Sequence, residues 1–159
     1  MIKLARDYTV VIFGNTMELH GGSWRVHASA LDDVALIIKG IEEISGGKKE
    51  VNIDKGKSSI GAMQTTIESK MNRKAALKSL KSISNDSWRK MTELRWIEKL
   101  DSEGNIHIRL ELSKLVLGKL EIAPDNYSKR VVKGKFKIAH FPGEEIESVA
   151  KRLYRTLIE

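Results

Sequence analysis

Short runs of alternating or β-branched residues in this chain are separated by longer stretches in which apolar residues recur every three or four positions. The short runs predict strands, because successive side chains of a strand point to opposite faces. They cover residues 8–13, 16–20, 23–28, 48–53, 106–112, 115–122 and 129–141. The longer stretches predict helices over residues 30–45, 58–71, 73–83 and 86–95 and from residue 142 onward.

Turn and cap residues set the boundaries expected in the first third of the chain. Gly21-Gly22 is expected to turn the chain between two strands. Ser29 is expected to cap the next helix, whose first turn would hold Asp32 and Asp33. Gly46-Gly47 is expected to end that helix.

The helix predicted over residues 58–71 depends on spacing alone. Ile60, Met63, Ile67 and Met71 recur three or four positions apart, as on one face of a helix. These residues would form the apolar stripe of the helix.

The order of the elements predicts one compact α+β domain over residues 1–159, with an antiparallel sheet packed with helices. Residues 1–47 would supply strands plus a helix, and residues 113–159 strands plus a terminal helix. Residues 48–112 would form a basic, largely helical segment between them.

The central stretch, residues 70–112, shows the order helix, polar turn, helix, turn and strand. Ser84-Asn85-Asp86 offers N-cap chemistry before the second helix, and residues 101–105 form a turn before the alternating strand 106–112. This order resembles the winged-helix (winged helix-turn-helix) nucleic-acid-binding superfamily. The resemblance implies a central winged-helix-like segment whose wing is a strand pair within residues 97–112.

The resemblance also implies a DNA-binding site, with the second helix in the major groove and the lysines of the first helix on phosphates. The implied nucleic-acid-binding residues are Lys74, Lys78, Lys81, Arg89, Lys90, Thr92, Arg95 and Arg109. The side chains expected to face inward are Trp88, Met91, Leu94, Trp96 and Ile97.

The charge distribution agrees with a polyanionic partner. The formal net charge is +7, and residues 48–99 hold 13 basic and 6 acidic side chains. Basic surfaces concentrate polyanions and release their counterions on binding, so nucleic acid is the first partner to consider, with DNA ahead of RNA. A lysine-rich face that serves solubility alone is the alternative explanation.

A second basic element provides an alternative nucleic-acid-binding site. Alternation places Lys133, Lys135 and Lys137 on one face of a strand, near Tyr127. Lysines beside an aromatic ring suit single-stranded nucleic acid, whereas an edge strand protected against aggregation would show the same lysines. The alternative site comprises Tyr127, Lys129, Arg130, Lys133, Lys135 and Lys137.

Enzymatic chemistry has little support in the sequence. The histidines lack metal-ligand spacing, and there is no cysteine. Gly56-Lys57-Ser58 resembles the end of a phosphate-binding loop, but Val51 occupies the position of the first glycine. We therefore expect a non-enzymatic protein without a catalytic site, cofactor or metal.

The remaining expectations concern location and assembly. No apolar stretch approaches the roughly 20 residues that a bilayer requires, and nothing resembles a signal peptide. An intracellular (cytoplasmic), nucleic-acid-associated protein is expected, with no membrane partner. A homodimer is compatible with the sequence. A protein-interaction or assembly subunit, such as a viral one, is the alternative from another functional class.

Overall fold

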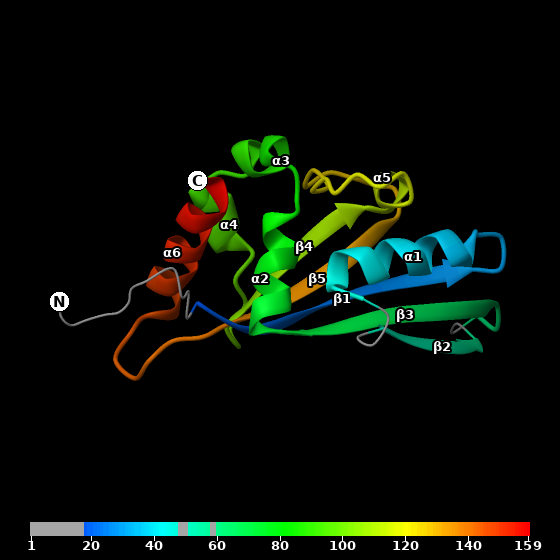
Figure 1. The fold of residues 1–159 in the computed structure, drawn as a ribbon, viewed down its shortest axis with the longest axis horizontal. Helices are drawn as coiled ribbons and strands as arrows, with labels where there is room; N and C mark the ends of the chain where they lie inside the picture. Colours follow the sequence, from blue (N-terminus) through cyan, green and yellow to red (C-terminus); the bar gives the residue numbers. More distant parts are fainter. Residues whose placement is uncertain (1–17, 48–50, 58–59) are drawn as a thin grey trace.

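The computed structural model describes residues 18–47, 51–57 and 60–159 of the chain. Within these residues it has the predicted α+β class, with an antiparallel sheet packed with helices (Figure 1). The strands are β1 (Leu19–Ser29), β2 (Val51–Lys57), β3 (Met63–Asn72), β4 (Asn105–Glu111) and β5 (Val131–Ile138). The helices are α1 (Val34–Ser45), α2 (Arg73–Lys81), α3 (Asn85–Lys90), α4 (Glu93–Glu98), α5 (Leu112–Leu115) and α6 (Ile146–Ile158).

The strands form one five-stranded antiparallel sheet in the order β2-β3-β1-β5-β4. The central strand, β1, pairs with β3 on one side and with β5 on the other. β4 completes the sheet at the edge beyond β5. Strands from both halves of the chain therefore lie side by side in a single sheet.

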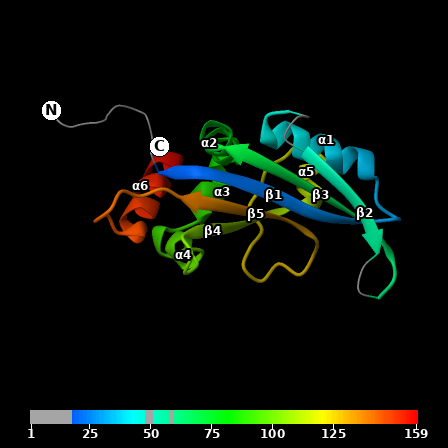
Figure 2. The same cartoon turned by 90° about the horizontal axis from the view of Figure 1, so that it is seen from below.

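One face of the sheet is covered by helices, and most side chains on the opposite face are exposed or half-buried. α1 and α2 lie against β1 and β3, while α6 packs against α4 at one end of the sheet (Figures 1 and 2). β5 shows the alternation plainly, since every second residue is buried. The buried positions on β5 are Val132, Gly134, Phe136 and Ile138.

An aromatic pair fills the middle of the covered face. Trp24 on β1 and Phe136 on β5 are both buried and meet edge to face, with ring centroids 5.2 Å apart. Gly134 allows this contact, because a Cβ there would come within 2.4 Å of the Trp24 ring. The Trp24 indole N–H donates a 2.7 Å hydrogen bond to Ser79 Oγ and so ties α2 to the sheet.

A second aromatic cluster lies where α3, α4 and α6 meet. The ring centroids of Trp88 and Trp96 are 5.5 Å apart, and those of Trp96 and Tyr154 are 6.2 Å apart. The Trp96 indole N–H donates a 2.8 Å hydrogen bond to the Ala150 carbonyl on α6. The predicted burial of Trp88 is confirmed, because its exposed fraction is 1%.

The predicted turn at Gly21-Gly22 is wrong. β1 runs through both glycines without reversing, and Gly22 lies opposite Met71 on β3. A Cβ at Gly22 would come within 2.4 Å of the Phe136 ring. This glycine therefore serves a close approach between neighbouring strands rather than a turn.

The predicted helix over residues 58–71 is also wrong, because residues 63–72 form β3. Met63, Ile67 and Met71 are four positions apart, and a spacing of four places side chains on one face of a strand as well as of a helix. The β-branched residues Thr65 and Thr66 between them favour the strand. Ile60 precedes β3 and is 88% exposed.

The second predicted helix, 86–95, is two short helices. Met91 is extended, and the Thr92 side chain caps α4 by accepting a hydrogen bond from the Arg95 N–H. Leu94 is 71% exposed, so its predicted burial is wrong. A threonine cap within the stretch outweighs its overall helical pattern.

The predicted strand pair within residues 97–112 is reduced to one strand. Leu100 and Ile106 form an isolated bridge across the turn, and β4 takes β5 as its full partner. The strand predicted over residues 115–122 is wrong, because its described structure is the end of α5 followed by irregular chain.

Other boundaries agree more closely with the sequence. The structure confirms α2, β4, β5, α6 and the end of α1, where Gly46 has a φ of 94°. Asp33, rather than Ser29, caps α1 by accepting a hydrogen bond from the Leu36 N–H. The strand predicted over residues 8–13 lies outside the described residues. No helix in the described part of the chain is long and apolar enough to cross a membrane.

Candidate nucleic-acid interface

The exposed face of the sheet gathers basic side chains from four strands. Because side chains of a strand alternate between faces, the positions between the buried residues of each strand all point to this side. We call the set the basic sheet face. Its members are Arg25, Lys70, His107, Arg109, Lys133, Lys135 and Lys137.

Three of these residues form a row across neighbouring strands. Lys133 on β5 lies opposite Arg25 on β1 and opposite Arg109 on β4. In the next row, Lys135 lies opposite His107 on β4. Like charges directly opposite each other destabilise a sheet, so the row of Arg25, Lys133 and Arg109 raises the free energy of the unliganded protein.

Acidic compensation on this face is sparse. No ion pair joins Arg25, Lys133 or Lys135 to a carboxylate among the described residues. Glu68 lies opposite Arg25 on β3, on the side away from Lys133. Lys137 donates a hydrogen bond to the Glu103 carbonyl. The row therefore presents positive charge to solvent that no nearby carboxylate of the described residues neutralises in an ion pair.

A groove of about 570 Å³ lies in the basic sheet face. Gly21 and Gly22 line it, and their small size leaves room beside the long basic side chains. Lysines from β3 and β5 lie on its walls. Five lysine and arginine side chains line it against one carboxylate, that of Glu68, and this excess of positive charge suits a chain of anionic groups.

Two histidines on this side have charged side chains nearby. Burial, with the cations Arg25 and Lys133 adding to it, lowers the pKa of His27. His107 Nε2 lies 2.7 Å from the Asp101 carboxylate, and this hydrogen bond holds the pKa of Asp101 well below its usual range. Asp101 thereby places the His107 ring at the rim of the groove.

The residues implied by the winged-helix resemblance do not form one surface with Arg109. Lys74, Lys78 and Lys81 are exposed on α2, which packs on the covered side of the sheet. Arg109 belongs to the row on the opposite face. Arg89 is exposed on α3. The implied wing contact therefore lies away from the implied first-helix contacts.

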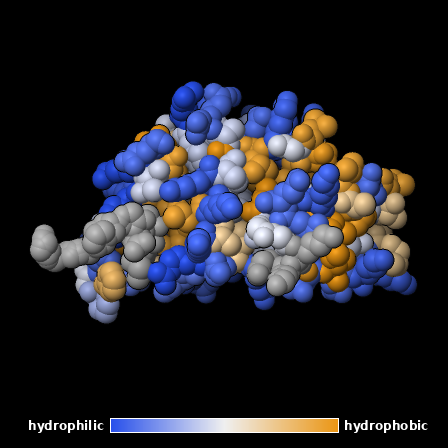
Figure 3. All heavy atoms as spheres, in the orientation of Figure 1, coloured by the Kyte–Doolittle hydropathy of each residue, from blue (hydrophilic) through white to orange (hydrophobic). Residues whose placement is uncertain are grey.

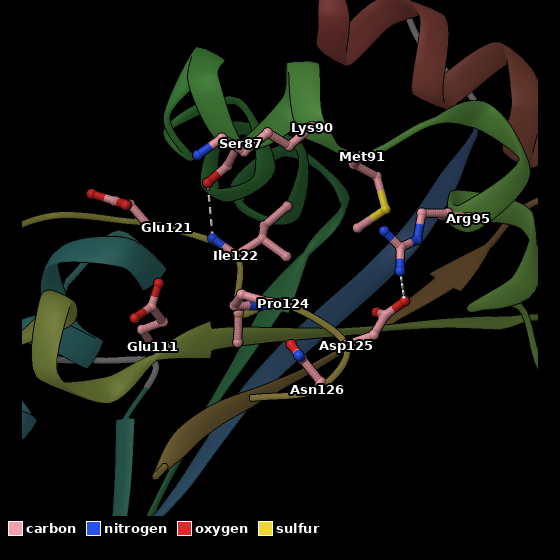
Figure 4. A pocket seen from close by; sticks show the side chains of 11 residues that line it. Ser87, Lys90, Met91, Arg95, Glu111, Glu121, Ile122, Pro124, Asp125 and Asn126 are labelled. Carbon is pink, nitrogen blue, oxygen red and sulfur yellow. Dashed lines mark hydrogen bonds and ion pairs between the residues drawn. The ribbon is translucent and has the colours of Figure 1, made fainter. Parts of the chain in front are cut away.

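The rest of the implied recognition helix is paired with acids or used as a cap. Lys90 Nζ lies 3.3 Å from the Asp86 carboxylate, and Thr92 caps α4. Arg95 points to Asp125 across a pocket of about 480 Å³ (Figure 4). Carboxylates also line this pocket from Glu111 and Glu121. A phosphate here would meet negative charge.

The alternative residue set divides into two places. Lys133, Lys135 and Lys137 belong to the basic sheet face. Tyr127, Lys129 and Arg130 instead line a mainly apolar groove of about 370 Å³ beside the start of α1. Tyr127 is therefore not a stacking partner beside the lysines of β5.

Arg130 has a structural role in that second groove. Its guanidinium lies 2.5 Å from the Asp32 carboxylate and donates a 2.6 Å hydrogen bond to the His27 carbonyl. These contacts connect the segment before β5 to the turn between β1 and α1. The Arg130 side chain, joined by the Ser29 N–H, lowers the pKa of Asp32 to about 2.

This ion pair predicts an acid-dependent contribution to stability. The folded pKa of Asp32 is depressed, so its stabilisation is complete above about pH 4 and is lost as the pH falls toward about 2. Asp32→Asn should cost about 1 kcal/mol at pH 7, since the pair is partly exposed, and almost nothing near pH 2. Urea unfolding of both proteins across this range measures the difference. An equal cost at both pH values would contradict the assignment.

Sequence reasoning did not place Arg25, Lys70 and His107 in a site. The alternation around Arg25 and His107 indicates which side of their own strands they occupy. Which strands pair, and in which register, is decided by contacts between distant segments. Among the described residues, no group of three His, Asp or Glu side chains could hold a metal ion.

The fold is similar to solved structures of archaeal proteins. Mth689, a DUF54 protein from Methanothermobacter thermautotrophicus, has a TM-score of 0.70 and 18% identity, over 89% of this chain and 99% of its own. AF2318 from Archaeglobus fulgidus, also DUF54, has a TM-score of 0.68 and 14% identity, over 88% and 99%. SSO0741 from Sulfolobus solfataricus, described in the same way, has a TM-score of 0.60 and 16% identity, over 86% and 98%.

No family model matches the sequence, and no curated protein does. At identities this low, the likeness concerns the arrangement of helices and strands. Function therefore has to be inferred from the residues of this chain.

Proposed function

We propose that the protein is a non-enzymatic nucleic-acid-binding protein that holds the phosphate backbone on its basic sheet face. The observation that carries the proposal is the row of Arg109, Lys133 and Arg25, exposed or half-buried on three adjacent strands. A polyanion lying over the row would relieve the repulsion between these side chains. It would also release counterions, which is the main source of affinity for phosphate backbones.

Contact with phosphates accounts for this face better than contact with bases. Single-strand binding surfaces use exposed aromatic rings on which bases stack. None of the described aromatic residues lies exposed on the basic sheet face. Trp24 and Phe136 point to the covered side, and Tyr127 lines the groove beside α1. Binding should therefore depend little on base sequence, since phosphates are the same at every step.

The sheet face also has an advantage over the α3–α4 segment as an anion site. Arg95 and Lys90 on that segment face Asp125 and Asp86, respectively. A ligand would have to displace these carboxylates before it reached the cations. On the sheet, Lys133 and Lys135 have no such acidic partner among the described side chains. The lysines of α2 remain exposed and serve as a natural comparison.

A salt titration tests the proposal. We expect the wild-type protein to bind labelled duplex DNA, its single strand and the RNA equivalents, with log K falling linearly against log salt concentration. The slope should be about −0.9 per phosphate contact on duplex DNA and about −0.7 on single strands. Fluorescence anisotropy at several salt concentrations, on two unrelated sequences, measures both slope and sequence preference. Absent binding at low salt would favour a protein-interaction or assembly subunit instead.

A further inference from the structure

The two edges of the sheet differ in whether the outward-facing backbone groups of the edge strand are hydrogen-bonded. At the β4 edge, the His107 N–H donates to the Lys99 carbonyl at 3.0 Å, and the Ala123 N–H donates to the Arg109 carbonyl at 2.8 Å. Neighbouring chain segments thus form backbone hydrogen bonds with part of the outer side of β4. At the opposite edge, no backbone hydrogen bond from the described residues reaches the outer side of β2.

β2 also carries exposed apolar surface. Ile53 is 48% exposed, and Met63 on the neighbouring strand is 56% exposed. Both lie on the helix-covered side of the sheet, where α1 contacts β2 but leaves these two side chains about half exposed. Figure 3 shows apolar surface over the region where β2 lies. An open edge flanked by apolar side chains is a template for another strand.

We propose that β2 pairs antiparallel with β2 of a second copy of the chain, joining two five-stranded sheets into one continuous sheet. Such a pair is self-complementary, because a two-fold axis normal to the sheet brings the same strand to itself in antiparallel orientation. The helices of both copies then lie on one side, and both basic sheet faces lie on the other.

Among the registers that pair at least five residues of β2 with its copy, the side chains favour one. With Ile53 on the axis, Asn52 lies opposite the partner's Asp54 and Val51 lies opposite the partner's Lys55. The amide of Asn52 can donate to that carboxylate, and the two isoleucines meet. With Asp54 on the axis, two carboxylates would face each other, and with Lys55 on the axis, two ammonium groups would. Centring on Ile53 avoids both repulsions.

The choice of a second copy rests on this match of side chains, which pairs an amide with a carboxylate and sets no like charges opposite each other. A foreign strand would have to match the sequence Val-Asn-Ile-Asp-Lys, whereas another copy of β2 already does. The main-chain hydrogen bonds supply affinity, and the register supplies specificity. The paired segment is short, so we expect a dimer that forms at micromolar concentrations.

Sedimentation or light scattering across a concentration series tests the dimer. We expect a mass near 36 kDa at high concentration, twice the 17.9 kDa of one chain. Asn52→Asp places two carboxylates opposite each other at two symmetric positions and should raise the dissociation constant about tenfold. Asn52→Lys places opposite charges there and should lower it. Ile53→Lys should abolish the dimer by setting two ammonium groups on the axis.

Leu94→Lys is the matched control, because Leu94 is exposed on α4, away from the β2 edge. It should leave the dissociation constant unchanged. Circular dichroism and thermal melts of each variant, at concentrations where it is monomeric, show that the monomer is folded. A wild-type protein that stays monomeric above 100 µM overturns the proposal (about 100-fold above the expected range). A dimer whose dissociation constant is changed by neither Asn52→Asp nor Ile53→Lys also overturns the proposal.

Discussion

Replacing Lys133, Lys135 and Lys137 together by glutamine should lower the affinity for duplex DNA by roughly two to three orders of magnitude at 0.1 M salt. Each lost phosphate contact removes about 0.9 of a decade at that salt concentration, so three contacts give about 2.7 decades. The slope of log K against log salt should become shallower by the same amount. The variant should fold, because these side chains are exposed and one of them, Lys133, lies in a row of like charge.

The control for this variant is the α2 triple, Lys74, Lys78 and Lys81 to glutamine. It removes the same charge from exposed positions on the covered side of the molecule. Anisotropy titrations should show a small loss of affinity and a nearly unchanged slope. If the α2 triple loses the affinity and the β5 triple keeps it, the helix-turn-helix surface would replace the basic sheet face as the binding site.

Replacing Trp96 by alanine should lower the free energy of unfolding by about 3–5 kcal/mol, the range for removing a buried aromatic side chain. Trp96 is fully buried between Trp88 and Tyr154, and its indole N–H satisfies the Ala150 carbonyl. The substitution would leave a cavity between α4 and α6 and remove the indole hydrogen bond that joins the two helices at the Ala150 carbonyl. Urea unfolding followed by circular dichroism measures the loss.

Leu94→Ala provides the comparison within the same helix. Leu94 is 71% exposed, so its truncation should change stability by no more than about 0.5 kcal/mol. Trp96→Phe keeps much of the ring volume and should lose less than Trp96→Ala, which gives a measurable variant if the alanine protein does not fold. Equal costs for Leu94→Ala and Trp96→Ala would contradict the packing described for α4.

The sequence predicts the α+β class and several helices because those signals are local. α6 has apolar residues at helical spacing, and Gly46 in a left-handed conformation ends α1 as expected. Local patterns gave wrong predictions where the same pattern is compatible with more than one structure. The spacing of four along Met63, Ile67 and Met71 fits a strand and a helix equally, and the side-chain cap supplied by Thr92 is hidden within a helical pattern.

The candidate site is harder to read than the fold. Alternation in β5 places its three lysines on one face from sequence alone. Nothing local indicates that Arg25 and Arg109, 84 positions apart in the chain, lie on either side of Lys133. Their meeting depends on β1 running straight through Gly21-Gly22 and on β4 pairing with a strand that follows it after an irregular segment.

The residues of β5 alternate strictly between the covered face and the exposed face of the sheet. This alternation limits where the chain can gain or lose residues. One residue inserted in the middle of β5 would exchange the two faces beyond that point, turning lysines toward Trp24 and apolar side chains toward solvent. Most of the irregular segment from residue 116 to residue 130 has no such alternation between two faces, so an inserted residue there would not exchange buried and exposed side chains. Insertions, affinity tags and reporter peptides therefore belong at its exposed residues 128–129, away from the Asp125 ion pairs, and β5 has to keep its length.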